Sequence, residues 1–556
     1  MSDPLIIEAA DLRKDYGHVE ALRGLNLQVP VGSIFGFLGR NGAGKTTTIK
    51  VLLGMARPTS GRVRVFDLPA DVPEQSVHIR RRTGFVSEEK DLYDSMTVEE
   101  IVRFTAAFYP RWRADLEQRY ARKFELPPDR KVKALSRGMR TKLALLLALC
   151  RGADLLVLDE PTSGLDPAVA EEVLQALVAH VAGEGLTVFF SSHQIAEVDQ
   201  IADRVAIVGS RSCGSGGPAR ESARGLSSYS ARLRRRGAGA RLPIARDRAR
   251  RPRGARHHRA HEQRRRSRAG RSAPSQPRVG RHRSRLAERD LPRDGDGGGL
   301  KMLWYKSWLE TRWRFLIGLA LLMCSTAGVI LIHPRLMALM PMADTIDPVG
   351  ELGQRIKESV DLSRTYRGYV WSQLFRQNLT QMGTLFAILL GTGGLFSYSS
   401  GGAALFTLSL PASRNRVVGV RAAAGLAEWL VLAFVPSLLI PMLSPAVGEA
   451  YGVGDVLAHS LCLFVGGSVF FSLAFLLSTV FPDLWRPMLM ACAVAVVLAI
   501  AGQAFREISR YGVFGVMSGE DYFRTGALPW LGLVVSVAAT TVMLYASALN
   551  VARQDF

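Results

Sequence analysis

The 556-residue chain contains a glycine-rich loop whose residue types and spacing could hold phosphate groups. The loop follows the apolar run Ile34–Leu38 and reads Gly39-Arg40-Asn41-Gly42-Ala43-Gly44-Lys45-Thr46. In the pattern G-x-x-x-x-G-K-[ST], glycines let backbone N–H groups converge on phosphates, the lysine adds positive charge, and the hydroxyl can bind Mg²⁺. We therefore predict a strand, a phosphate loop and a helix, with Lys45 on the outer phosphates and Thr46 on Mg²⁺. The alternative is a purely structural glycine turn.

A second apolar run ends in two carboxylates, because Leu155–Leu158 is followed by Asp159 and Glu160. Phosphoryl chemistry needs one carboxylate to hold the Mg²⁺ shell and another to accept a proton from the attacking water. We assign Asp159 to the metal and Glu160 to the base. Such a pair standing alone would instead be interpreted as a strand end with two solvated acids.

A histidine follows a third apolar run. Thr187–Ser192 ends directly before His193, where a neutral imidazole could contact a terminal phosphate. A lone histidine at a strand end is more often structural, so only the neighbouring motifs make His193 a second catalytic candidate.

These residues need a sheet to bring them together. From Met1 to Gly209, short apolar runs alternate with longer amphipathic stretches, which predicts an α/β domain with a largely buried sheet. The N-terminus has no basic region followed by a long apolar run, so we expect no secretory signal and a cytoplasmic start. The expected strands include Ser33–Leu38, Leu155–Leu158, Thr187–Phe190 and Val205–Val208.

On these motifs, residues 1–209 resemble the nucleotide-binding subunit of an ABC transporter, an α/β P-loop NTPase. The Walker A loop is Gly39–Thr47, the Walker B strand is Leu155–Glu160, the D-loop is Ser163–Asp166, and His193 is the switch histidine. The resemblance implies ATP and Mg²⁺ as cofactors, Glu160 and His193 as catalytic residues, and Thr46, Glu88 and Asp159 as metal ligands. It assigns nucleotide binding to Tyr16, which would stack on adenine, and to Gly39, Asn41, Gly42, Ala43, Gly44, Lys45, Thr46, Thr47, Ser136, Gly138 and Asp166.

Two motifs depart from the family pattern. The signature reads Leu135-Ser136-Arg137-Gly138-Met139 instead of the commonest form LSGGQ, although Ser136 and Gly138 are kept before an expected helix, Met139–Cys150. In the family this helix end caps the ATP bound by the other subunit. The resemblance therefore implies that the active form is a dimer and that an isolated monomer hydrolyses ATP poorly. The second departure is Glu88 in place of the Q-loop glutamine. A carboxylate can still reach Mg²⁺ through water, but the strength of coupling to the membrane part stays open.

The strongly basic character comes from one segment. Between Arg211 and Leu300 there are 26 Arg, no Lys and seven acidic residues, so this window carries +19 of the net charge of +22. It has one aromatic residue, Tyr229, and cannot bury enough apolar surface to offset its chain entropy. We therefore expect residues 210–300 to be a disordered linker rich in Arg, Gly and Pro.

The composition of this segment permits two explanations. A phosphate-binding arm would usually mix Lys with Arg, whereas Arg without Lys is typical of a GC-rich coding region read in the wrong frame. The family pattern also stops at Gly209, where a final strand pair and C-terminal helices of the domain would be expected. We hypothesise that a frameshift or sequencing error joins a nucleotide-binding subunit to a neighbouring permease. A real basic linker that contacts anionic lipid or RNA is the alternative.

The last part, residues 301–556, contains apolar blocks of membrane-spanning length, for which about 20 residues are needed. The segment Ala404–Arg421, between the second and third blocks, is expected to contain a coupling helix that docks on the nucleotide-binding domain. The region resembles the six-helix permeases of bacterial ABC exporters, and buried helices of a large soluble protein are the alternative. The six expected spans are Phe315–Ile332, Leu379–Phe396, Ala422–Leu443, Leu457–Val480, Pro487–Gly502 and Leu528–Leu549.

The expected fold class is thus an α/β P-loop NTPase domain of the ABC type, a disordered basic linker and an all-α six-helix transmembrane domain. The expected function is an ATP-driven exporter in the inner (cytoplasmic) membrane, with its nucleotide-binding domain in the cytoplasm. Its expected partners are a second ABC subunit, identical or different, the lipid bilayer and a solute that the sequence does not reveal. We expect no nucleic acid partner. The alternatives are a membrane sensor that signals without net transport and an inactive fusion of two subunits.

Overall fold

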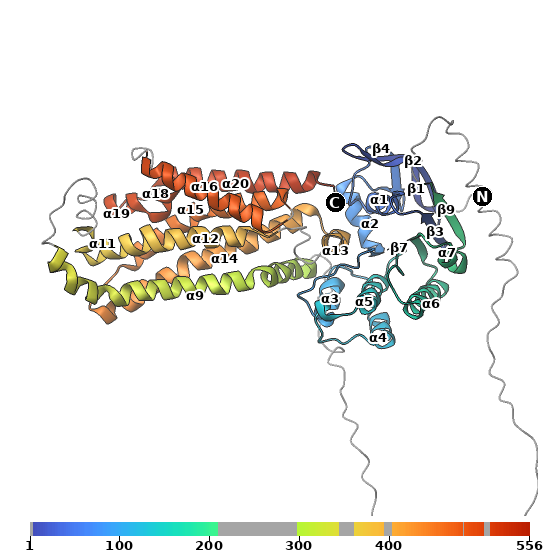
Figure 1. Ribbon diagram of the computed structural model, residues 1–556, viewed down its shortest axis with the longest axis horizontal. Helices are drawn as coiled ribbons and strands as arrows, with labels where there is room; N and C mark the ends of the chain where they lie inside the picture. Colours follow the sequence, from blue (N-terminus) through green and yellow to red (C-terminus); the bar gives the residue numbers. More distant parts are fainter. Residues whose placement is uncertain are drawn as a thin grey trace, which may run out of the picture.

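The computed structural model describes residues 4–209, 297–343, 361–393, 403–481, 483–504 and 512–555. Two bodies lie end to end, a domain of mixed strands and helices and a bundle of long helices (Figure 1). The expected disordered linker, residues 210–300, lies outside the described residues except for its last four, which already belong to a helix.

The first domain is built on a five-stranded parallel sheet. Its central strands are uninterrupted runs of buried residues, as burial on both faces of a parallel sheet requires. In register, Leu38 pairs with Ser192 and Asp159 with Ser191, so the carboxyl ends of three strands meet at one edge. All four expected strands are confirmed. The sheet order is β6 (Thr83–Val86), β7 (Leu155–Asp159), β8 (Thr187–Ser192), β3 (Ile34–Gly39) and β9 (Arg204–Val208).

Helices connect and cover these strands. The expected helix Met139–Cys150 begins two residues earlier than the sequence suggested, because the Ser136 side chain caps it by accepting from the backbone N–H of Met139. The helices are α1 (Lys45–Leu52), α2 (Pro73–Arg81), α3 (Val98–Ala106), α4 (Ala114–Lys123), the 3₁₀ turn η1 (Val132–Ala134), α5 (Arg137–Leu149), α6 (Pro167–Glu184) and α7 (Ile195–Ile201).

A second, antiparallel sheet completes this domain, and the sequence analysis did not anticipate it. Its long strands β1 and β2 are joined by a turn in which Gly17 adopts a left-handed conformation, and one face of β1 is buried against the domain core. The end of β1 places Tyr16 near the phosphate loop. The order is β2 (Val19–Pro30), β1 (Leu5–Tyr16), β4 (Ser60–Val65) and β5 (Leu68–Pro69).

The second body is all-helical. Its first helix, α9, is 47 residues long, or about 70 Å at 1.5 Å per residue, so it exceeds the thickness of a hydrocarbon core of about 30 Å. The part of α9 beyond this thickness reaches the first domain (Figure 1). There the Tyr305 hydroxyl donates to Glu100 of α3 at 2.8 Å. The elements are α9 (Gly297–Ala343), α11 (Tyr366–Val370), the π-helix η2 (Trp371–Asn378), α12 (Leu379–Gly391), α13 (Ala404–Ser409), α14 (Arg414–Leu443), the 3₁₀ turn η4 (Ser444–Val447), α15 (Val453–Val480), α16 (Trp485–Ala504), α18 (Val513–Ser518), α19 (Glu520–Thr525) and α20 (Trp530–Arg553).

Within the described residues, five helices are long and apolar enough to cross a membrane. The second expected span, Leu379–Phe396, is not among the five, because its helix α12 has only 13 residues, Leu379–Gly391. It is preceded without a break by α11 and the π-helix η2. Three residues of that expected span, 394–396, lie outside the described residues. The five are Gly297–Ala338, Arg414–Val447, Val453–Val480, Trp485–Gly502 and Trp530–Arg553.

The short helix α13 docks on the first domain, as expected for the segment between the second and third spans (Figure 1). Tyr93 shares a 2.8 Å hydrogen bond with Thr407 and packs edge-on against Phe406. Arg80 of α2 donates to the carbonyl oxygens of Leu410 and Ala412, at 3.0 and 3.2 Å. The chain after α13 is thus held to the first domain through its backbone.

We expect Arg80→Gln to loosen this junction, because two buried carbonyls would lose a charged donor, at a cost of about 1.5–3 kcal/mol. The matched control is Arg82→Gln, whose side chain is 47% exposed and pairs with Asp154 inside the first domain, so its loss should cost about 1 kcal/mol or less. Thermal unfolding of the purified chain in detergent measures both. Equal midpoints for the two variants would contradict this account of the junction.

Candidate functional site

The phosphate loop connects β3 to α1 and requires glycine at two positions. Gly42 and Gly44 have φ angles of +81° and +95°, which residues with a Cβ rarely adopt. A Cβ on Gly44 would also lie 2.6 Å from the carbonyl oxygen of Ala21. Gly44 therefore leaves no room for a side chain, whereas at Gly42 the backbone conformation alone favours glycine, and both let the backbone approach phosphates closely.

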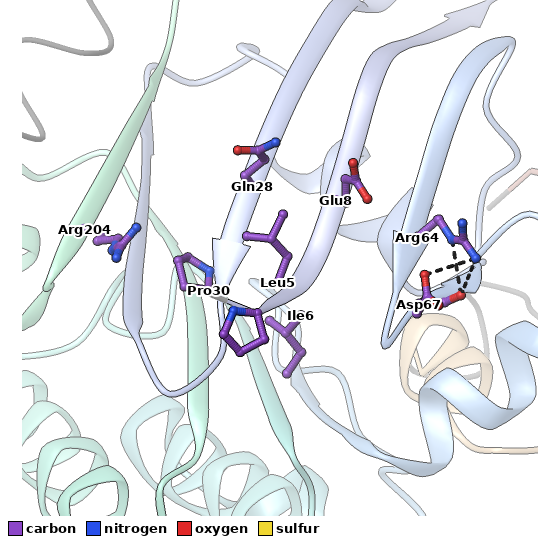
Figure 2. A pocket seen from close by; sticks show the side chains of 9 residues that line it. Leu5, Ile6, Glu8, Gln28, Pro30, Arg64, Asp67 and Arg204 are labelled. Carbon is purple, nitrogen blue, oxygen red and sulfur yellow. Dashed lines mark hydrogen bonds and ion pairs between the residues drawn. The ribbon is translucent and has the colours of Figure 1, made fainter. Parts of the chain in front are cut away.

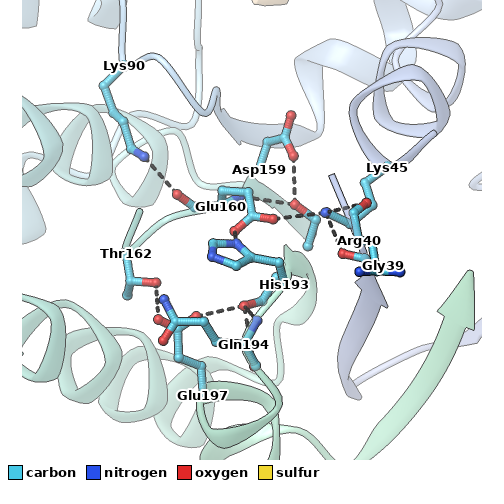
Figure 3. Close-up of polar contacts among 12 residues, drawn as sticks. Gly39, Arg40, Lys45, Lys90, Asp159, Glu160, Thr162, His193, Gln194 and Glu197 are labelled. Carbon is cyan, nitrogen blue, oxygen red and sulfur yellow. Dashed lines mark hydrogen bonds and ion pairs between the residues drawn. The ribbon is translucent and has the colours of Figure 1, made fainter. Parts of the chain in front are cut away.

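Lys45, the first residue of α1, is buried and folds back over the loop (Figure 3). Its Nζ donates to the carbonyl oxygens of Gly39 at 2.7 Å and Arg40 at 3.4 Å, and lies 3.1 Å from Oε1 of Glu160. The lysine charge thus lies between the phosphate loop and the Walker B strand. A bound outer phosphate would compete with Glu160 for this charge.

Glu160 is the centre of a second set of contacts. Its Oε2 lies 2.8 Å from Nδ1 of His193, and its backbone N–H donates to the Ser191 hydroxyl at 3.0 Å. Its carbonyl oxygen accepts from Nζ of Lys90 at 2.7 Å. Glu160 has a φ of +47°, an uncommon conformation for a residue with a side chain, and these contacts hold it there. The two predicted catalytic residues, Glu160 and His193, are therefore in direct contact (Figure 3).

Asp159 lies beside the phosphate loop and is almost fully buried. The Ser191 hydroxyl donates to its Oδ1 at 2.6 Å, and a hydrogen bond joins it to Thr46. Burial raises the pKa of Asp159, and the charge of Glu160 raises it further, while the bonds to Ser191 and Thr46 oppose this. A carboxylate and a hydroxyl in contact are the protein ligands that a phosphate-bound Mg²⁺ uses.

Glu88, the third predicted metal ligand, is exposed just after β6. Its partial burial raises its pKa, and the charges of Asp159 and Glu160 raise it further, which places the three carboxylates within electrostatic reach of one another. Among the residues that the structure describes, no group of three or more His, Cys, Asp or Glu is placed to hold a metal ion by itself.

Lys90 and Glu197 are site residues that the sequence analysis missed. Lys90 is buried, and burial lowers its pKa to about 8 although the nearby carboxylates, Glu88 foremost, favour its charged form. Glu197 accepts from the hydroxyls of Thr162 at 2.6 Å and Ser192 at 2.8 Å. The available signal for Lys90 was a single lysine directly after two glutamates at a strand end.

Tyr16 is the last residue of β1. Its side chain is 36% exposed and is hydrogen-bonded to Thr47, the last residue of the predicted Walker A loop. An exposed aromatic ring next to a phosphate loop is available for stacking on a base.

The signature and D-loop residues have local contacts instead. Ser136 caps its own helix, Gly138 lies near Val169, and the carbonyl oxygen of Asp166 accepts from the N–H of Ala170. The side chains of Ser136 and Asp166 are exposed. The structure therefore does not bring these predicted ligands into contact with the phosphate loop of the same chain.

A hollow of about 570 Å³ lies on the antiparallel sheet, away from these residues (Figure 2). It is open to solvent, and its charged pair Arg64 and Asp67 is engaged internally at 3.1 Å. None of the predicted site residues lines it. The lining residues are Pro4, Leu5, Ile6, Glu8, Gln28, Pro30, Arg64, Asp67 and Arg204.

Comparison with known proteins agrees with the resemblance of the first domain to ABC transporters. A family model described as "ABC transporter" matches residues 22–163. The bacitracin transport ATP-binding protein BcrA of Bacillus licheniformis is 36% identical over 205 residues, which are 36% of this chain and 66% of that protein. The Nod factor export ATP-binding protein I of Cupriavidus metallidurans is 32% identical over 208 residues, which are 36% of this chain and 68% of that protein.

Among solved structures, an ATP-binding subunit of an ABC transporter is 27% identical, with a TM-score of 0.34, and the match covers 40% of this chain and 99% of that one. The chain spans slightly less than two thirds of the length of BcrA. Its coverage of the Nod factor export protein is a little over two thirds, at an identity above 30%. This chain therefore belongs to the ABC transporter family, whose ATP-binding domains hydrolyse ATP.

Proposed function

We propose that the chain is half of an ATP-driven exporter, in which MgATP binding and hydrolysis by a dimer drive solute efflux across the cytoplasmic membrane. The observation that carries this proposal is the docking of α13 on the loop after β6, whose Lys90 donates to the carbonyl oxygen of Glu160. A membrane segment fixed there is in a position to respond to the state of the nucleotide site.

Nucleotide binding would use the phosphate loop and Tyr16. The backbone from Gly39 to Thr47 surrounds the phosphates, Lys45 neutralises the outer phosphates, and the ring of Tyr16 stacks on adenine. When bound, Mg²⁺ supplies positive charge that neutralises the transferred phosphoryl group, with Thr46, Asp159 and Glu88 as its protein ligands or water contacts.

Hydrolysis would depend on freeing Glu160. In the structure its carboxylate pairs with Lys45 and His193. Phosphate binding withdraws Lys45, so Glu160 becomes available to accept a proton from the attacking water, while His193 keeps the carboxylate oriented. The left-handed backbone of Glu160, fixed by Lys90, aims this carboxylate toward the phosphates.

Dimerisation would complete each nucleotide site. The α5 N-terminus, with Ser136 and Gly138, and the exposed Asp166 are available to a second copy or a related subunit, whose ATP they would cap. Population shift then couples the sites to the membrane, because ATP favours the closed dimer over the open one.

The contacts that support coupling form a short path. Phe406 and Thr407 of α13 contact Tyr93, and the loop containing Tyr93 also contains Lys90, which donates to the carbonyl oxygen of Glu160. A shift of α13 would therefore move Glu160, the base that activates water.

Export and an inner-membrane location are also proposals. The five apolar helices support a membrane protein, and the printed names of BcrA and the Nod factor protein refer to bacitracin transport and Nod factor export. Bacitracin is therefore the first solute to test, in inverted vesicles that contain the full chain.

We also propose that residues 1–209 and 301–556 are complementary parts of one transporter, whether or not the segment between them is translated as written. Residues 1–209 would then be the nucleotide-binding domain and residues 301–556 a six-helix permease. Intact-mass measurement separates the two cases, because a fused product has a mass of 60.8 kDa.

We expect Glu160→Gln to bind MgATP but to lower turnover by about 10²- to 10⁴-fold, because the general base is lost. Phosphate release by the chain in lipid nanodiscs measures turnover, and ATP-dependent bacitracin uptake by inverted vesicles measures transport. A variant that hydrolyses ATP at the wild-type rate would contradict the role of Glu160. Wild-type turnover without transport of any tested solute would favour the sensor alternative.

We expect two inactive variants, Lys45→Ala and Gly138→Asp, to restore activity when co-expressed. A heterodimer pairs the intact phosphate loop of one chain with the intact signature of the other, so up to about a quarter of wild-type turnover should return if pairing is random. The control pair is Lys45→Ala with Glu160→Gln. Both residues belong to the half of the site that contains the phosphate loop, so each site of the heterodimer keeps one defect and the mixture should stay inactive. Equal activity of the two mixtures would contradict a site shared between chains.

A further inference from the structure

Lys14 and Tyr16 lie two residues apart on β1, so their side chains point to the same face of the strand. Nζ of Lys14 lies over the Tyr16 ring, 4.7 Å from its centroid. Lys14 is 4% exposed and Tyr16 is 36% exposed. A buried cation thus covers one face of the ring that the proposed function assigns to adenine.

The partner of Lys14 comes from the other end of the chain. Asp555 follows the last membrane helix, α20, and its Oδ2 lies 2.5 Å from Nζ of Lys14. Its Oδ1 accepts from the backbone N–H of Arg57 at 3.0 Å, so one carboxylate contacts the first domain at two points. Figure 1 shows the end of the chain beside this domain.

Arg414 fixes the segment that carries Asp555. One guanidinium nitrogen donates to the carbonyl oxygens of Val551 and Gln554, at 3.2 and 2.6 Å. The other donates to the carbonyl oxygen of Met55 in the first domain, at 2.6 Å. The approach of Asp555 to β1 is therefore held by side chains of both domains.

The electrostatics agree with this geometry. Burial raises the pKa of Asp555, but hydrogen bonds from Lys14 and from the N–H of Arg57 outweigh it, so its pKa lies below the usual range and the group is ionised at neutral pH. Burial raises the pKa of Tyr16, and the charge of Asp555 raises it further. The carboxylate is thus close enough to act on the ring.

We propose that Asp555 is a positioning residue for the base end of the nucleotide site, which holds Lys14 against one face of Tyr16 and leaves the opposite face to adenine. The inference rests on the proposed function, because it takes Tyr16 as the stacking residue. Under this proposal, the affinity for the base depends on docking of the segment after α20. The affinity for the phosphates does not.

The test measures binding of MgATP and of Mg-tripolyphosphate, which has no base, to the full-length chain by calorimetry. We expect Asp555→Asn to raise the Kd for ATP about three- to tenfold, the scale of one cation–π contact, and to leave the Kd for tripolyphosphate unchanged. Asp555→Glu, which keeps the charge, should retain most of the ATP affinity.

Two further variants separate positioning from general damage. Lys14→Met should give the same selective loss, and combining it with Asp555→Asn should add nothing, because both act through one contact. The matched control is Asp483→Asn, a carboxylate of similar exposure that pairs with Arg486 in its own domain, and it should leave both Kd values unchanged.

Three results would decide against the inference. An unchanged Kd for ATP in Asp555→Asn would overturn it, and so would an equal loss for ATP and tripolyphosphate, which would indicate a disturbed domain. Additive losses in the double variant would overturn the route through Lys14. A wild-type chain that binds neither ligand would instead overturn the proposed function, on which the inference rests.

Discussion

A buried positive charge between the two domains determines how they must fit together. Arg80 is 6% exposed, and burial lowers the pKa of its guanidinium to about 10, so it remains charged at neutral pH. It needs acceptors, and it finds Leu53 and Ser76 in its own domain and Leu410 and Ala412 after α13. A shift of the segment after α13 that kept Arg80 buried would leave this charge with half of its acceptors, which is costly. The junction is therefore a specified contact rather than a sliding surface.

The position of that junction explains why the site and the membrane helices could act together. The α13 segment contacts Tyr93, a few residues from Lys90, and Lys90 fixes the carbonyl oxygen of Glu160. Both Lys90 and Glu160 have positive φ angles, so each is held in a conformation that its neighbours must maintain. Two such positions joined by one hydrogen bond give this part of the site few alternative arrangements.

Much of the site was predictable from the sequence because its chemistry is local. The loop from Gly39 to Thr46, the acids at the end of β7 and the histidine after β8 follow apolar runs, and parallel strands bring such ends to one edge. What could not be predicted depends on long-range pairing. No local pattern relates the residues that pair in the antiparallel sheet. The same holds for the hydrogen bond from Lys90 to the carbonyl oxygen of Glu160 and for the contact between Asp555 and Lys14. Five of the six expected spans coincide with helices long and apolar enough to cross a membrane, whereas the π-helix η2, which precedes the second expected span, was not predicted, because its backbone widening leaves no signature in composition.

The separate attachments of the first domain have a mechanical consequence. They are the contact of Tyr305 in α9 with Glu100, the Arg80 contact after α13, and the Lys14 contact with Asp555 after α20. A body held at one point can swivel in any direction, whereas each further separate point removes rotational freedom, and three points that are not in line leave none. If these attachments persist through a working cycle, rotation of the first domain would be transmitted directly to the helices α9, α14 and α20.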